Sequence, residues 1–157
     1  MSVKRECSFP RPDFSELFKW VGPKAVADLR AIEKTARCAK GKVLYAEHQE
    51  VTGAYWIHSG KVTLSVTDDQ RAIRILRVAQ APDIIGLWAT LSGNPYIVTA
   101  KTVSACQLGF IKREEFIRYL SDHGEFTFHI LRLLSEDVIT TFEQARSLHQ
   151  TRFRAPQ

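Results

Sequence analysis

The chain has 157 residues, a net charge of +5 and a hydrophobic content of 45%, which is ordinary for a globular protein. Its length suffices for one domain with a sizeable core, and no apolar run approaches the roughly 18 residues that a membrane span needs. No apolar stretch follows the basic residues near the N-terminus, so we expect no signal peptide, no membrane partner and a cytoplasmic location.

The charged residues and the cysteines also limit the function classes. Lysines and arginines are spread along the chain among acids, which is typical of a solvated surface and predicts weak DNA binding at most. Cys7, Cys38 and Cys106 are odd in number, far apart in the sequence and not in C-x-x-C spacing. We therefore expect reduced thiols and not a disulfide framework, a zinc site or an iron–sulfur cluster.

Two helical segments are predicted before any strand. Residues 14–20 form a short amphipathic piece, and Pro23 opens a longer helix because proline suits the first helical position. The predicted apolar stripe of this second helix consists of Val26, Leu29, Ala31, Ile32 and Ala36.

From Gly41 onward the pattern changes to short β-rich runs. Strands are predicted at residues 42–45, 54–58, 61–67, 71–78 and 101–110, with a turn at 68–70. In the third run Val62, Leu64 and Val66 alternate with Thr63, Ser65 and Thr67, which predicts one buried and one wet face. Many short strands between helices predict a mainly β fold with flanking helices, a double-stranded β-roll of the jelly-roll kind.

Residues 86–100 read GLWATLSGNPYIVTA and resemble the phosphate-binding cassette of cyclic-nucleotide-binding domains. The positions that match without a gap are Gly86, Ala89, Gly93, Pro95 and Thr99. The resemblance implies a tight turn and a short helix, whose N–H groups and one arginine hold the cyclic phosphate while a glutamate takes the ribose hydroxyl. Here Leu87 stands at the glutamate position and Tyr96 at the arginine position. A phenol cannot make the bidentate contact of a guanidinium with phosphate, so we expect no response to cAMP.

The cassette residues are the candidates for an effector pocket. With the two charged groups replaced, this pocket would be apolar and aromatic. It could hold a small apolar effector of unknown identity, be filled by its own side chains, or bind nucleotide weakly. The candidate residues are Gly86, Leu87, Trp88, Ala89, Tyr96, Ile97, Val98 and Thr99.

The last third of the chain predicts a long helix over residues 126–150. Its apolar residues recur at intervals of four, four, three, four and three, the a/d seam of a coiled coil, which predicts a homodimer. The alternative is a helix that packs only on its own domain. The seam consists of Ile130, Leu134, Val138, Thr141, Ala145 and Leu148.

In this order and spacing the features resemble the sensor domain of bacterial regulators of the Crp/Fnr superfamily. Residues 55–62 (YWIHSGKV) and 107–116 (QLGFIKREEF) resemble two further segments of that domain. The resemblance implies a dimeric sensor whose long helix passes a ligand-induced change to a following helix-turn-helix domain. On this basis residues 1–150 are the sensor and dimerisation domain. Residues 151–157 are then a hinge toward a DNA-binding domain that this chain lacks.

Two alternatives remain open beside this reading. Some members of the superfamily sense gases through haem, and the histidines could supply axial ligands, although none has diagnostic spacing. They are His48, His58, His123, His129 and His149.

A stand-alone cupin-like metal enzyme would also be a small β-roll. However, residues 47–50 with His58 lack the H-x-H pair and the later histidine, so we predict no metal site and no catalytic residues.

Overall fold

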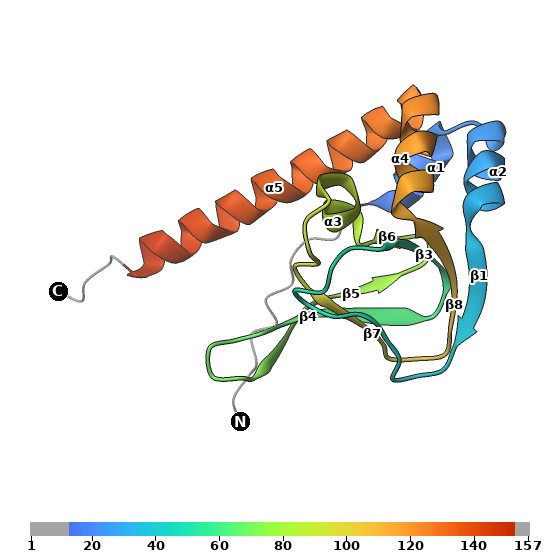
Figure 1. The fold of residues 1–157 in the computed structure, drawn as a ribbon. Coiled ribbons are helices and arrows are strands. Elements are labelled where there is room, and N and C mark those ends of the chain that lie inside the picture. The colour runs from blue at the N-terminus through green and yellow to red at the C-terminus, as the bar shows by residue number, and fades with distance from the viewer. Residues whose placement is uncertain (1–12, 153–157) are drawn as a thin grey trace.

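The computed structural model describes residues 13–152, which form a β-roll with helices on both sides of it in the chain (Figure 1). The helices are α1 (Phe14–Trp20), α2 (Pro23–Ile32), α3 (Leu87–Ser92), α4 (Arg113–Asp122) and α5 (Gly124–Arg152). The strands are β1 (Lys34–Cys38), β2 (Val43–Tyr45), β3 (Gly53–Ser59), β4 (Lys61–Thr67), β5 (Ile73–Gln80), β6 (Ile84–Ile85), β7 (Thr99–Thr102) and β8 (Cys106–Lys112).

The strands form two antiparallel sheets of four, with the orders β1-β8-β3-β6 and β2-β7-β4-β5. Between them lies a core to which both sheets contribute, with Ile57 and Leu108 from the first sheet and Val62 and Ala100 from the second. This arrangement confirms the predicted double-stranded β-roll with flanking helices.

A second core forms where the helices pack on the outer face of the first sheet. On β3, Ala54 and Trp56 face this helical core while Ile57 faces the interior of the roll, as the alternation of a strand requires. Phe116 of α4 and Phe126 of α5 are fully buried there. These contacts fix the start of α5, and the rest of the helix extends past α3 and away from the helical cluster (Figure 1).

The predicted N-terminal helices are confirmed, but the apolar stripe predicted for the second helix extends beyond the end of that helix. Pro23 stands at the first position of α2 as expected. The helix ends at Ile32, and Ala36 belongs to β1, where it pairs with Leu108 of β8. The pattern missed β1 because this edge strand exposes all of its side chains except that of Cys38.

Three further strand predictions need correction. Residues 101–110 hold the end of β7 and most of β8, which belong to different sheets, and the two-residue β6 was not predicted. Thr63 and Ser65, expected on a wet face, are buried because β4 lies between β5 and β7. The turn at 68–70 is confirmed, with the Asp68 carboxylate accepting hydrogen bonds from the N–H groups of Gln70 and Ala72.

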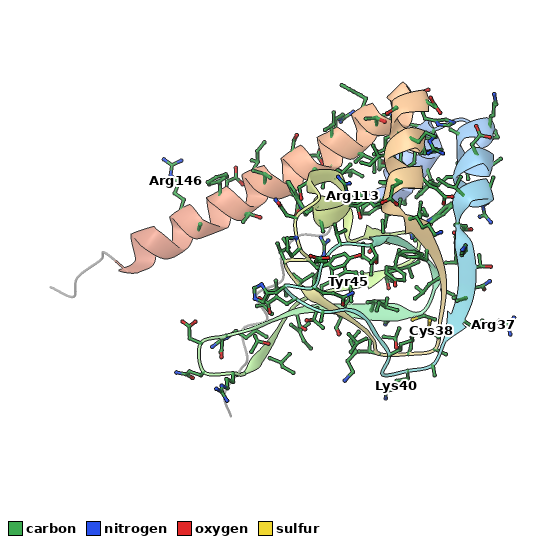
Figure 2. All side chains as sticks on the ribbon, viewed as in Figure 1. Arg37, Cys38, Lys40, Tyr45, Arg113 and Arg146 are labelled. Atoms are coloured by element: carbon green, nitrogen blue, oxygen red, sulfur yellow. The ribbon has the colours of Figure 1, made fainter. Side chains whose placement is uncertain are left out.

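Two cysteines that are distant in the sequence meet in the first sheet. Cys38, labelled in Figure 2, lies at the end of β1, directly opposite Cys106 of β8 by strand register, and both are buried free thiols. The distance along the sequence is therefore no argument against a disulfide for this pair, because β1 and β8 bring the two residues to opposite positions. Their reduced state stays a prediction. Cys7 lies outside the described residues.

The helix α5 continues through Arg152, beyond the predicted boundary at residue 150. Among residues 13–152, no helix combines the length and the hydropathy that crossing a membrane requires.

Candidate functional site

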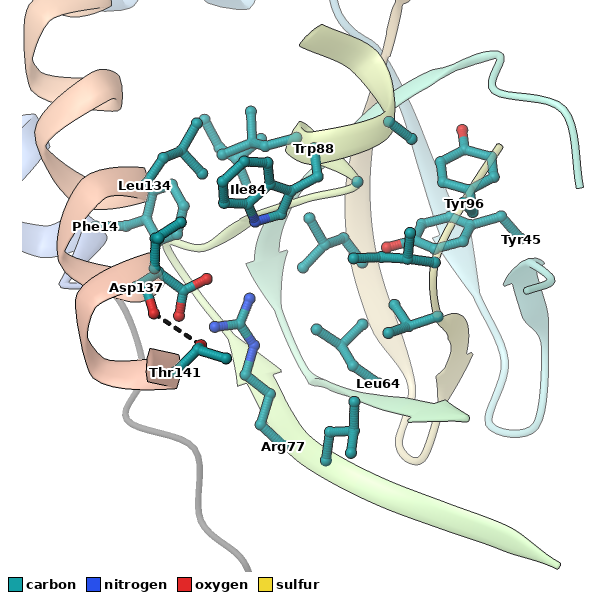
Figure 3. A pocket seen from close by; sticks show the side chains of 18 of the residues that line it. Phe14, Tyr45, Leu64, Arg77, Ile84, Trp88, Tyr96, Leu134, Asp137 and Thr141 are labelled. Carbon is teal, nitrogen blue, oxygen red and sulfur yellow. Dashed lines mark hydrogen bonds between the residues drawn. The ribbon is translucent and has the colours of Figure 1, made fainter. Parts of the chain in front are cut away.

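A cavity of about 600 Å³ lies between the roll and α5 (Figure 3). Its walls come from β4, β5, β6, α3, the segment after α3 and the middle of α5. The lining is mostly apolar, and its charged residues are Arg77 of β5 and Asp137 of α5. The volume lies within the range of about 300 to 1,000 Å³ that is usual for small-molecule sites.

The cavity brings together most of the residues that the sequence singled out. Thr99 is the exception among the candidates, because its hydroxyl accepts a hydrogen bond of 2.9 Å from the N–H group of Glu47 and lies outside the lining. The predicted residues in the lining are Gly86, Leu87, Trp88, Ala89, Tyr96, Ile97 and Val98.

The cassette has the backbone that the resemblance implied. Gly86 adopts a left-handed conformation (φ 81°) before the short helix α3, and its carbonyl accepts hydrogen bonds from the N–H and the hydroxyl of Thr90. The Arg113 guanidinium donates to the Thr90 carbonyl at 2.9 Å, which anchors α3 to the start of α4. The scaffold of the cassette is therefore intact although its two charged residues are replaced.

Tyr96, which stands where the resemblance implies an arginine, is part of the packed structure of the roll. Its side chain is only 2% exposed, and its ring stacks on Tyr45 with 3.9 Å between centroids. Its hydroxyl donates to the Gly53 carbonyl at 2.6 Å and accepts from the N–H groups of Thr52 and Gly53, both at 3.2 Å. A Cβ atom at Gly86 would lie 3.2 Å from the Tyr96 ring, so this ring fills the space beside the cassette turn.

Leu87, at the position of the family's glutamate, is also buried. It borders the cavity and at the same time belongs to the helical core with Phe14, Leu17 and Leu120. A carboxylate at this position would lose its hydration among apolar side chains, at a cost of several kcal/mol. Neither replaced position offers a polar group to a nucleotide.

The cassette side chains leave the cavity open. Trp88 and Ile97 border it and are exposed, while Ala89 is small and buried. Since about 600 Å³ of space remains between the roll and α5, the single chain does not fill its own pocket.

Two residues of β5 that line the cavity were not predicted from the sequence. The register of β4 and β5 shifts so that Leu64 pairs with Arg77 and Ser65 with Ile75, which leaves Leu76 as the extra residue of a β-bulge. Because of this bulge, the successive residues Leu76 and Arg77 both face the cavity. Strict alternation would place them on opposite faces, and the sequence carried no signal for the bulge.

Tyr45 contributes a buried phenol to the cavity wall. Burial raises the pKa of its hydroxyl far above the ordinary value, and the Tyr96 phenol adds to this effect while the positive charge of Arg77 opposes it. The hydroxyl therefore stays protonated at neutral pH and is able to donate a hydrogen bond.

The predicted seam of α5 faces the chain's own roll. Ile130 is 1% exposed in the helical core, whereas Leu134, Val138, Thr141 and Ala145 line the cavity. The side chain of Leu148 lies outside the described residues. Four large apolar side chains on α5 are exposed, and the last of them also borders the cavity: Phe128, Leu131, Ile139 and Phe142.

The histidines do not gather at the cavity. No histidine with a described side chain lines it, and no three described His, Cys, Asp or Glu residues are placed to hold a metal ion. His58 is bonded to Glu33 at 2.7 Å and His123 to Asp28 at 2.9 Å. His149 lies outside the described side chains. The described residues of this site therefore do not fit a haem held by histidine.

Comparison with known proteins identifies the family of this domain. The family described as "Cyclic nucleotide-binding domain" matches residues 35–123, which is more than half of the chain. A comparison with curated proteins finds no matching sequence.

Three solved structures illustrate the likeness in fold. The catabolite activator protein of Thermus thermophilus is 19% identical with a TM-score of 0.80, over 85% of this chain and 62% of that one. The N-terminal domain of a transcriptional regulator from Streptomyces coelicolor is 21% identical with a TM-score of 0.67, over 88% and 94% of the two chains. The sensor domain of the transcriptional regulator DNR from Pseudomonas aeruginosa is 21% identical with a TM-score of 0.65, over 90% and 88%.

These likenesses confirm the expected fold. The chain spans about 62% of the length of the Thermus protein and most of the length of the two isolated sensor-type domains. The fold predicted from the cassette and its neighbours, that of a cyclic nucleotide-binding domain, is therefore the fold of this chain.

Proposed function

The chain belongs to the cyclic nucleotide-binding domain family, and we propose that it is the sensor and dimerisation domain of a Crp/Fnr-type transcription regulator that responds to a small molecule other than a cyclic nucleotide. The observation that carries this proposal is the open cavity between the roll and α5, closed on the cassette side by Tyr96.

The argument against a cyclic nucleotide rests on the two replaced charges. Each lost charge-assisted contact costs about 1.5 to 3 kcal/mol, so two together weaken binding by roughly a hundredfold to ten-thousandfold. Tyr96 cannot turn to supply a substitute, because its hydroxyl is bonded to the backbone of Gly53 and its ring stacks on Tyr45.

The argument for sensing rests on the position of α5. A molecule in the cavity would contact the roll at Leu64 and Ile85 and the long helix at Leu134 and Val138. It would therefore favour one arrangement of α5 on the roll over others, which is the differential contact that a ligand-driven change requires.

The exposed apolar side chains of α5 support dimerisation. Phe128, Leu131, Ile139 and Phe142 are large, exposed and on the same helix, and such a patch on a single chain marks an interaction surface. We place the same face of a second copy against it, as in a coiled coil. Signal output to DNA would belong to a domain outside these 157 residues, and the regulator would act in the cytoplasm.

The cupin-like enzyme is not proposed. The residues considered for its metal site have other partners: His58 is hydrogen-bonded to Glu33, and Glu47 accepts a hydrogen bond from the N–H group of Thr67. No observation in the described part of the chain favours catalysis.

Native mass spectrometry of the chain as purified tests the proposed function. We expect particles of two chains, and a small molecule that is released on unfolding when the host cell supplies a suitable one. A mass of one chain at micromolar concentration would contradict dimerisation, and stoichiometric cAMP or cGMP would contradict the proposed ligand class.

A further inference from the structure

Two polar groups of the cavity have no partner within the described residues. Arg77 is half-buried and its guanidinium points into the cavity (Figure 3), yet no residue whose side chain the structure describes forms a hydrogen bond or ion pair with it. A guanidinium keeps its charge at every physiological pH and presents several N–H donors. The cavity therefore contains a guanidinium that has no direct ion-pair partner among the described side chains, although Asp137 is also in the lining.

The second group is the hydroxyl of Tyr45. This side chain is 2% exposed, its ring is held by Tyr96, and its hydroxyl points toward the cavity (Figure 3). No described residue shares a hydrogen bond with this hydroxyl. Because this hydroxyl borders the open cavity, it is not among the buried polar atoms that lack a partner, and a bound acceptor would take the place of water as its hydrogen-bond partner.

Arg77 and Tyr45 act on the same part of the cavity. Both line it, and the positive charge of Arg77 is felt at the Tyr45 hydroxyl. Asp137 on α5 is the other charged residue of the lining, and it forms no ion pair with Arg77. The space between Arg77 and Tyr45 is thus a donor-rich position in an otherwise apolar wall.

From this geometry we infer that the cavity binds an apolar monocarboxylic acid, with its carboxylate between Arg77 and Tyr45 and its hydrocarbon part against Ile85, Trp88 and Val138. The inference rests on the proposed function, in that the cavity is the effector site. One negative charge balances Arg77, and Asp137 disfavours a second one.

Decanoate and decan-1-ol are a matched pair of probes that differ only in the charged group. Binding is followed by isothermal titration and by the change in fluorescence of Trp88, with Trp88→Phe showing that the signal comes from the cavity. We expect decanoate to bind wild-type protein at least about tenfold more tightly than decan-1-ol, as a charge-assisted contact should give.

Three variants assign this preference to its residues. Arg77→Met should remove the preference for decanoate while decan-1-ol still binds, which also shows that the variant keeps its cavity. Asp137→Asn should strengthen decanoate binding several-fold without affecting decan-1-ol, because it removes a like charge. Arg74→Met is the control, since it removes a positive charge from the same strand at an exposed residue that pairs with Asp68.

The outcomes separate this inference from the proposed function. Equal binding of the two probes, or an undiminished preference in Arg77→Met, would overturn the inferred ligand class and leave the cavity as an effector site. If neither probe binds at about 1 mM, equivalent to roughly 4 kcal/mol, the cavity is filled in solution by the chain or by a second copy. Both the inference and the proposed function would then be wrong.

Discussion

The hydroxyl of Tyr96 donates a 2.6 Å hydrogen bond to the carbonyl oxygen of Gly53, which joins the segment after α3 to the first residue of β3. Both groups are buried. The residue at the position where the resemblance implies a phosphate-binding arginine thus joins two segments of the roll in this chain.

The change Tyr96→Phe tests the structural role of this hydroxyl. The ring can still stack on Tyr45, but the Gly53 carbonyl and N–H lose their partner, so the free energy of unfolding should fall by about 1 to 3 kcal/mol in urea denaturation. The control is Tyr55→Phe, because the Tyr55 hydroxyl makes only a 3.4 Å contact with the Leu44 carbonyl in a partly exposed setting. Equal losses in the two variants would contradict the role given to Tyr96.

The exposed face of α5 gives a prediction about oligomeric state. The paired change Leu131→Glu and Phe142→Glu should convert dimers into folded monomers in sedimentation experiments, because both side chains are exposed on the single chain. By contrast, Ile130→Ala should lower the free energy of unfolding by about 2 to 5 kcal/mol, because it leaves a cavity in the helical core. A dimer that survives the paired change would show that the partner lies elsewhere.

His123 makes stability depend on pH. Its Nδ1 lies 2.8 Å from the Tyr119 carbonyl and its Nε2 lies 2.9 Å from the Asp28 carboxylate, so only the imidazolium can donate to both. Burial acts to lower the pKa of His123, but the hydrogen bonds to Asp28 and Tyr119 outweigh it, and the pKa is raised above the ordinary value. This stabilisation is complete below the unfolded pKa of about 6.5 and is lost as pH rises through the folded pKa.

The matched variant for this effect is His123→Gln, which keeps a polar side chain without the titrating charge. The difference in free energy of unfolding between wild type and variant should be largest near pH 5.5 and shrink toward about pH 8.5. A difference that stays constant or grows over this range would contradict the assignment.

The fold could be predicted from the sequence where the pattern was strong and local. The hairpin of β4 and β5, the proline-initiated helix α2 and the cassette each carry their own turn or capping residues. The edge strand β1 could not be recognised, because an exposed strand has no alternation of apolar residues and is defined by its partner β8.

The candidate site could be predicted only where its residues are contiguous in the sequence. The cassette residues are contiguous, so their resemblance located one wall of the cavity. Arg77 faces the cavity because of a β-bulge. A bulge changes the side of the sheet to which the following residues point, and the order of apolar and polar residues does not reveal it. The apolar period of α5 could be recognised in the sequence, but the period does not say whether the chain itself or a partner covers it, and Ile130 packs in the chain's own helical core.

Isothermal titration of cAMP and cGMP into the wild-type chain tests the central claim most directly, because it asks whether the cassette still serves a cyclic phosphate. With Leu87 in the helical core and the Tyr96 hydroxyl bonded to Gly53, we expect dissociation constants in the high-micromolar range or no detectable heat. A dissociation constant below about 10 μM, equivalent to roughly 7 kcal/mol of binding, would contradict the account and show that another residue replaces the missing arginine.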